Sequence, residues 1–174
     1  QTDYYSNTMK KLNSAITSRE VTEGNLQVGF ARINITPKIV NGAQDPSKGE
    51  FNKIKLSGFG DGKYVTGVHD SIYSKAVAIE VDNNLIILVS ADLLLMPPEV
   101  VEKVEEKLKM RSNIVGKQIF FGATHTHSSI GNCIPSFVGE KFGGEYQPEV
   151  VEWLSGKITD VILNSISDLQ SSQF

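Results

Sequence analysis

The feature that most constrains the fold is a strand, helix and strand pattern in residues 85–123. Residues 85–89 (LIILV) are apolar throughout, which is typical of a strand buried inside a sheet. Pro97 and Pro98 then open a predicted helix, and residues 117–123 form the next predicted strand. The apolar stripe of that helix consists of Val100, Val101, Val104 and Leu108. Because a crossover helix makes its two strands parallel, this segment predicts an α/β fold.

A β-hairpin is predicted directly ahead of this unit. Residues 73–81 and 85–91 are expected to be strands, and the Asp82-Asn83-Asn84 turn between them tolerates left-handed geometry. Alternating apolar residues predict another strand over 26–35, and helical spacing predicts a long helix from Pro148 to about Leu169. Residues 41–52 and 128–144 are expected to be loops. The expected class is therefore α/β, a mixed sheet with flanking helices in which a hairpin precedes the β-α-β unit.

Length and composition limit the organisation and the partners. The 174 residues fit one domain, which we expect over residues 26–174, preceded in residues 1–25 by an amphipathic helix or a leader packed on the body. The net charge of −3 comes without a Lys/Arg cluster, so we expect no nucleic-acid partner. No apolar run reaches the length of a membrane-spanning helix. Cys133 is the single cysteine, so no disulfide can form within the chain.

Two of the three histidines stand in residues 123–128 (ATHTHS), just after the second strand of the β-α-β unit. In an extended segment, His125 and His127 would point to the same face and into one pocket. Such a pair suits metal binding, proton transfer or both, although a surface turn that happens to hold two histidines is the alternative. Asp92 ends the other strand of the unit. If the strands are neighbours, Asp92 shares one rim with the histidines and can orient a ligating imidazole, bind metal itself or cap the strand.

A catalytic zinc site usually has three protein ligands, so two histidines leave it incomplete. The remaining candidates are His69, Asp70, Asp92 and Cys133. For His69 the alternative is a hydrogen bond to a nearby backbone group, and for Cys133 it is a small buried thiol. Residues 56–62 (LSGFGDG) hold three glycines, including Gly58, which permit positive φ and a close approach to another group or else form a flexible turn. A serine nucleophile at Ser128 is not favoured, because no G-x-S-x-G elbow surrounds it.

Five segments in order resemble the N-terminal catalytic domain of the neutral/alkaline, non-lysosomal ceramidase family. The segments are residues 28–37 (VGFARINITP), 56–60 (LSGFG), 67–76 (GVHDSIYSKA), 89–92 (VSAD) and 123–128 (ATHTHS). The match runs from about residue 26 to the end of the chain. Family members are several hundred residues long and take further zinc ligands, a His, a Glu and a Tyr, from sequence beyond this length. The resemblance therefore implies part of a catalytic domain, a fragment or a truncated relative.

The resemblance implies a zinc-dependent amide hydrolase that cleaves ceramide into a fatty acid and a sphingoid base. His125 would be a zinc ligand, and His127 would transfer a proton or stabilise the transition state. The substrate loops would include Gly58, Ser128 and Gly131. The implied setting is secreted or periplasmic, with a lipid or amide substrate and contact with a membrane surface. The family usually has a Gly-Pro-Gly-Gly type loop where this chain has residues 129–132 (SIGN). A catalytically inactive binding module and a hydrolase of another amide or ester therefore remain alternatives.

Overall fold

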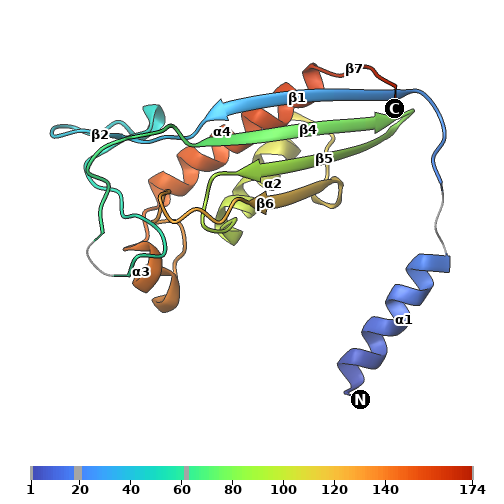
Figure 1. Ribbon diagram of the computed structural model, residues 1–174, viewed down its shortest axis with the longest axis horizontal. Helices are drawn as coiled ribbons and strands as arrows, with labels where there is room; N and C mark the ends of the chain where they lie inside the picture. The colour runs from blue at the N-terminus through green and yellow to red at the C-terminus, as the bar shows by residue number, and fades with distance from the viewer. Residues whose placement is uncertain (1, 18–20, 61–62, 174) are drawn as a thin grey trace.

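The structure, a computed structural model, describes residues 2–17, 21–60 and 63–173 and has the predicted α/β class. Its main element is a mixed five-stranded sheet in the order β6-β5-β4-β1-β7 (Figure 1). The strands are β1 (Leu26–Asn34), β4 (Tyr73–Val81), β5 (Asn84–Ala91), β6 (Ile119–Ala123) and β7 (Gln170–Ser171). Within this sheet, β5 and β6 are parallel neighbours, and the other described pairs are antiparallel.

The predicted hairpin and β-α-β unit are both present. β4 and β5 pair from Val81 opposite Asn84 to Ser74 opposite Ala91. Asp82 in the turn has φ 51°, the left-handed geometry expected there. The helix α2 (Pro98–Arg111) then crosses over to β6, which lies directly beside β5. The parallel strands required by the sequence pattern are therefore neighbours in the sheet.

Two helices cover one face of the sheet and enclose the core (Figure 1). These are α2 and α4 (Pro148–Ser167), which pack against each other, and α4 also lies along β1 and β4. Gly29 of β1 allows this approach, because a Cβ there would lie 2.0 Å from the Ser165 carbonyl oxygen. Fully buried core side chains come from both layers and include Ile87, Val100, Val104, Leu154, Ile158 and Ile162. The apolar stripes predicted for both helices thus face the sheet.

Several short elements were not expected. The predicted loop over residues 41–52 contains a 3-10 turn, η1 (Pro46–Lys48), and the strand β3 (Glu50–Phe51), which pairs with β2 (Lys38–Ile39). The predicted loop over 128–144 contains the helix α3 (Phe137–Gly143), which begins where the Ser136 hydroxyl accepts a hydrogen bond from the Gly139 amide. The β7 strand pairs with residues 27 and 28 of β1. A second 3-10 turn, η2 (Gly116–Gln118), precedes β6.

The N-terminal segment forms the helix α1 (Asp3–Thr17), which Figure 1 shows away from the sheet. None of the residues of this described helix is buried, so it is not packed on the body. Residues 18–20, the end of the expected helical segment, lie outside the described residues. The division into residues 1–25 and 26–174 stays a prediction. Among the described helices, none combines the length and the apolar character needed to cross a membrane.

Candidate functional site

The two carboxyl ends of β5 and β6 place Asp92 and the histidine pair at one rim of the sheet. Ala91 and Ala123 are register partners at these ends, and the Thr124 amide continues the ladder by donating to the Ala91 carbonyl at 3.0 Å. The Asp92 carboxylate accepts from the Tyr73 amide at 2.9 Å. Asp92 thus caps the start of β4, and its predicted role toward a ligating histidine stays a prediction.

His125 lies just beyond the end of β6 in a left-handed conformation with φ 60°. This conformation costs a non-glycine residue on the order of 1–3 kcal/mol and persists only where surrounding contacts enforce it. One such contact joins the His125 Nδ1 to the Leu94 carbonyl oxygen at 2.8 Å. Because a carbonyl only accepts, Nδ1 carries the proton in this contact. In the neutral form of the ring, Nε2 then carries no proton, and its electron pair can bind a metal ion. Metal-ligating histidines commonly have this tautomer.

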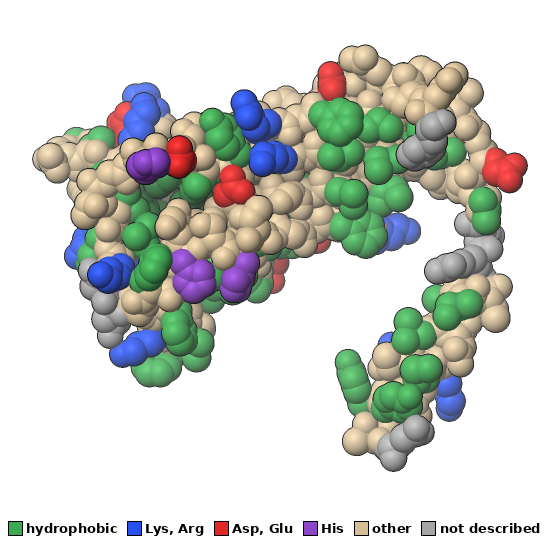
Figure 2. All heavy atoms as spheres, viewed as in Figure 1, with side chains coloured by type: hydrophobic (Ala, Val, Ile, Leu, Met, Phe, Trp, Pro, Cys, Tyr) green, Lys and Arg blue, Asp and Glu red, His purple; other side chains and the backbone are tan. Residues whose placement is uncertain are grey.

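The rings of His125 and His127 meet edge to face, with their centroids 5.5 Å apart. Figure 2 shows two histidine side chains together on the visible face and the third apart from them. The pair does not arise from an extended segment, as the sequence suggested, because β6 ends at Ala123 and the chain turns at His125. The turn still brings both imidazoles to one place.

The loop that contains Gly58 holds the His127 ring. Gly58 has φ 82°, and a Cβ at this position would lie 2.4 Å from the His127 Nδ1. Phe59 contacts the same ring edge to face at a centroid distance of 5.6 Å. The close approach expected of this glycine-rich segment is therefore present, and the group approached is His127. Asp61 and Gly62, at the end of the segment, lie outside the described residues.

The other two residues predicted for substrate loops have different environments. Ser128 is exposed and lines a cavity of about 520 Å³. His69, from another segment of the chain, lines the same cavity. Gly131 is buried, and a Cβ there would lie 2.1 Å from the Gly143 carbonyl oxygen and 2.7 Å from that of Lys55. The glycine at residue 131 is thus required by contacts within the protein. The predicted substrate roles of Gly58, Ser128 and Gly131 stay predictions.

An apolar cavity of about 300 Å³ adjoins the histidine loops. Its apolar side chains include Leu94, Leu95, Ile130, Ile134, Val138 and Phe142. Leu94 lines this cavity, and its carbonyl oxygen accepts the hydrogen bond from His125. Phe142 also lines the cavity, and its carbonyl oxygen accepts a hydrogen bond from the Gly58 amide at 2.9 Å. The cavity therefore shares its supporting loops with both histidines. Its volume is at the lower end of the range for small-molecule sites.

The additional ligand candidates do not gather around the histidine pair. His69 is exposed, and its Nδ1 contacts the neighbouring Asp70 carboxylate at 2.8 Å. Cys133 is buried, its thiol lies 3.1 Å from the Gly131 carbonyl oxygen, and burial, with a smaller effect of Glu99, raises its pKa to about 12. The thiol is therefore protonated at neutral pH and is a poor ligand. Within residues 2–17, 21–60 and 63–173, no group of three or more His, Cys, Asp or Glu side chains could hold a metal ion.

This donor set fits a catalytic zinc only in part. The His125 Nε2 has the right tautomer, and His127 lies beside it, but a third ligand from the described residues is missing. Leu94 was missed by the sequence analysis, because its contribution is a backbone carbonyl that no side-chain pattern reveals. Phe59 was likewise missed, since one exposed aromatic residue in a glycine-rich loop carries no distinctive signal.

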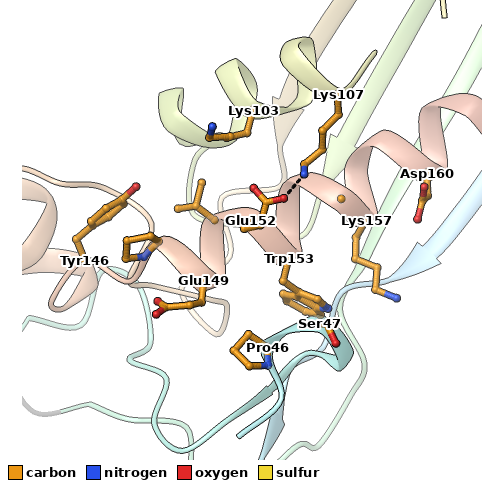
Figure 3. A pocket seen from close by; sticks show the side chains of 13 residues that line it. Pro46, Ser47, Lys103, Lys107, Tyr146, Glu149, Glu152, Trp153, Lys157 and Asp160 are labelled. Atoms are coloured by element: carbon orange, nitrogen blue, oxygen red, sulfur yellow. Dashed lines mark hydrogen bonds and ion pairs between the residues drawn. The ribbon is translucent and has the colours of Figure 1, made fainter. Parts of the chain in front are cut away.

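A larger groove lies elsewhere, along α4 and η1 (Figure 3). It has a volume of about 710 Å³ and contains lysines and carboxylates, among them an ion pair between Lys107 and Glu152. Trp153 forms its floor beside Pro46 and Ser47. Its described lining includes no histidine, and it shares none of the residues of the histidine site. We therefore place the candidate site at the β5 and β6 rim.

Comparison with solved structures gives the clearest external relationship. The chain superposes on the crystal structure of neutral ceramidase from Pseudomonas aeruginosa with a TM-score of 0.72 and 19% sequence identity. A ceramidase complexed with C2 gives a TM-score of 0.73 at 19% identity. Each match covers 86% of this chain and 22% of the ceramidase chain. No protein-family model and no curated protein matches the sequence. The chain thus resembles neutral ceramidase, having the fold of a segment that makes up about a fifth of that enzyme.

Proposed function

We propose that this chain carries the histidine part of the active site of a zinc-dependent amide hydrolase that acts on ceramide. The observation that supports the proposal most strongly is the His125 ring, held by Leu94 with its Nε2 available beside His127. The shared fold with neutral ceramidase supports it independently. The remaining ligands and the activity would belong to the complete catalytic assembly.

His125 is the proposed metal ligand. Its Nδ1–H bond to the Leu94 carbonyl fixes the ring orientation and makes Nε2 a better donor. A bound zinc ion would polarise an amide carbonyl and lower the pKa of a coordinated water toward neutrality. The left-handed backbone of His125 persists only because surrounding contacts enforce it, and one of these contacts, with the Leu94 carbonyl, also orients the ring.

His127 is the proposed proton-transfer residue. Its ring lies against Gly58 and Phe59 and edge to face with His125, so its orientation is restricted by three neighbours. An imidazole can act as a general acid, and in this position it can donate a proton to the nitrogen that leaves when an amide bond is broken. A second role, donating a hydrogen bond to the developing oxyanion, uses the same ring.

The proposed substrate is an N-acyl lipid. The apolar cavity of about 300 Å³ beside Leu94 and Phe142 offers an alkyl chain a place next to the histidines. Ser128, at the exposed end of the same loop, is available for a polar headgroup. We further propose a secreted or periplasmic setting and contact of the intact protein with a lipid surface, which the ceramidase-like fold supports.

A catalytically inactive binding module is the second candidate. It is favoured by the missing third ligand within the described residues and by the tight packing of the 129–132 loop around Gly131. Such a module would keep the apolar cavity and would bind an amide lipid without turnover. A hydrolase of another amide or an ester is the third candidate, and it would keep the histidine roles.

Hydrolysis assays on the longest protein that contains this chain test the proposal. We expect His125→Ala to abolish release of fatty acid from a ceramide, and His127→Ala to lower kcat by roughly 100-fold or more, the range typical of a general acid or base. Met110→Ala is the control, because this side chain is 78% exposed on α2 and lines none of the cavities described at the histidine loops, and it should retain activity. Full activity of His125→Ala would contradict the proposal. Ceramide binding without turnover by the unaltered protein would favour the binding module, and turnover of short-chain amides or esters alone would favour the third candidate.

A further inference from the structure

The loop that follows the histidine pair contains a buried asparagine in an uncommon backbone conformation. Asn132 is 3% exposed and has φ 62°, in the left-handed region that residues other than glycine seldom adopt. Asparagine is among the few side chains that tolerate this region. An amide side chain is rarely buried unless its polar atoms have partners. The hydrogen bonds of Asn132 therefore indicate what the residue does.

Asn132 forms hydrogen bonds with backbone groups of other segments of the chain. Its Oδ1 accepts from the Lys55 amide at 2.8 Å, and its Nδ2 donates to the Glu145 carbonyl at 2.7 Å. Its main-chain amide donates to the Gly143 carbonyl at 2.7 Å, and its main-chain carbonyl accepts from the Gln147 amide at 2.9 Å. Asn132 therefore joins the residue before the glycine-rich segment to the chain between α3 and α4.

An asparagine side chain matches both of its side-chain contacts. A main-chain amide only donates and a carbonyl only accepts, so Lys55 needs an acceptor and Glu145 needs a donor. An amide side chain carries one of each. A carboxylate would set an oxygen against the Glu145 carbonyl, and an apolar side chain would remove both bonds. The side chain at residue 132 is thus matched to one arrangement of the two segments.

The segment that Asn132 holds leads directly to the His127 ring. Next to the bond from Asn132, the Ser57 hydroxyl donates to the Ile130 carbonyl at 2.9 Å, which keeps the two loops paired. Gly58 follows, and a Cβ at this position would lie 2.4 Å from the His127 Nδ1. A shift in the pairing of the two loops would therefore move the backbone that borders the imidazole.

We propose that Asn132 is a positioning residue for His127. It sets the place of the segment that carries Gly58 and, through the contact of Gly58 with the ring, the orientation of the imidazole. The proton transfer that this orientation serves rests on the proposed function. Asn132 also lines the apolar cavity of about 300 Å³, so the same bonds hold one wall of the proposed site for the alkyl chain.

Substitution of Asn132 by glycine tests the positioning role on the full chain. Asn132→Gly removes the amide side chain and keeps a residue that adopts φ 62° without strain. Asn132→Ser is the second variant, because one hydroxyl oxygen cannot take the places of both amide atoms. Circular dichroism confirms that each variant is folded.

Asp82→Gly is the matched control. Asp82 is also left-handed, with φ 51°, and its carboxylate accepts from the Asn25 amide at 3.2 Å. It lies in the turn before β5, whereas the candidate site lies at the other end of that strand. The control therefore removes the same kind of hydrogen bond far from the histidines.

We expect the ring signals of His127 in NMR spectra to shift in Asn132→Gly and Asn132→Ser and to stay unchanged in Asp82→Gly. The Lys55 amide should exchange with solvent about tenfold faster in both Asn132 variants, the loss typical of one hydrogen bond. A purely structural role would lower stability and leave the His127 signals in place, and this result would overturn the proposal. A shift of equal size in Asp82→Gly would overturn it as well.

Hydrolysis by the longest protein that contains this chain separates the inference from the proposed function. Where the unaltered protein hydrolyses a ceramide, we expect Asn132→Gly to lower kcat by about tenfold or more and to change KM less, because a displaced general acid slows the chemical step. An unchanged kcat would overturn the positioning role. Absence of turnover in the unaltered protein would contradict the proposed function instead, and the ring signals and exchange rates would still decide whether Asn132 positions His127.

Discussion

Replacing Gly58 with Ala tests whether the His127 ring is held by the backbone of the preceding loop. The residue has φ 82°, and the new methyl group would lie 2.4 Å from the His127 Nδ1 and 2.7 Å from Cε1. The left-handed backbone alone costs alanine about 1–2 kcal/mol. Moving the ring or the loop adds about 1–3 kcal/mol, the usual cost of overpacking. Gly58→Ala should therefore lower the free energy of unfolding by about 2–5 kcal/mol.

Gly60→Ala is the matched control. Gly60 has φ 68°, but a Cβ at this position would meet no heavy atom of the described residues within 4 Å, so we expect only the backbone cost of about 1–2 kcal/mol. Urea unfolding of the parent and both variants measures the two losses. The loss in the free energy of unfolding should be larger for Gly58→Ala than for Gly60→Ala by about 1–3 kcal/mol, and this difference is the cost of the contact with His127. NMR of the histidine rings should show a shift of the His127 signals in Gly58→Ala and none in Gly60→Ala.

Equal losses of stability in the two variants, with unchanged His127 signals, would refute this reasoning. The imidazole would then be free to move away from Gly58, and the loop would have no part in orienting it. The proposed proton-transfer role of His127 would in turn lose its structural support.

Two further predictions concern the sheet and the buried thiol. Gly29→Ala should destabilise the protein by about 3 kcal/mol in urea unfolding, because the new methyl meets the Ser165 carbonyl oxygen at 2.0 Å. Gly122→Ala, where the nearest atom is 3.7 Å away, should cost less than about 1 kcal/mol, and similar losses at both positions would contradict the prediction. Burial raises the pKa of Cys133 from 9.0 to about 12. Between about pH 9 and pH 12 the thiol is therefore deprotonated in the unfolded chain but still protonated in the folded one, so the free energy of unfolding falls as the pH rises through this range. Cys133→Ala should show a shallower decline over this range, and an identical decline in both proteins would refute the assignment.

The sequence predicted the regular elements well because their signals are local and strong. The apolar run at residues 85–89, the turn at Asp82 and the stripe of α4 each follow from side-chain patterns, and the structure confirms the strand, the turn and the helix. The expected burial of the whole run was wrong, because Ile86 is 43% exposed and Leu88 is 46% exposed, and only the alternate residues face the helices. The helix α3 was missed because Gly139, Gly143 and Gly144 give its segment the composition of a loop. Its Ser136 cap was the available signal. The β7 strand is two residues long and depends on pairing with β1, which no local pattern reveals.

The candidate site could be predicted in its residues but not in its geometry. The HTH segment and the strand order indicated a site at the rim, and the structure places His125 and His127 there. The left-handed turn at His125 and the Leu94 carbonyl that fixes its ring depend on tertiary packing. The approach of Gly58 was expected from its glycine-rich segment, whereas its target could be found only from the structure.

A zinc titration of the full chain followed by NMR of the three histidine rings tests the central claim most directly. The account predicts that the His125 and His127 signals move together on addition of zinc, that the His125 change is centred on Nε2, and that the exposed His69 stays unchanged at equimolar metal. His125→Ala should remove the response at His127 as well. A response at His69 first, or an unaltered zinc affinity in His125→Ala, would contradict the assignment of the β5 and β6 rim as a metal-binding active site.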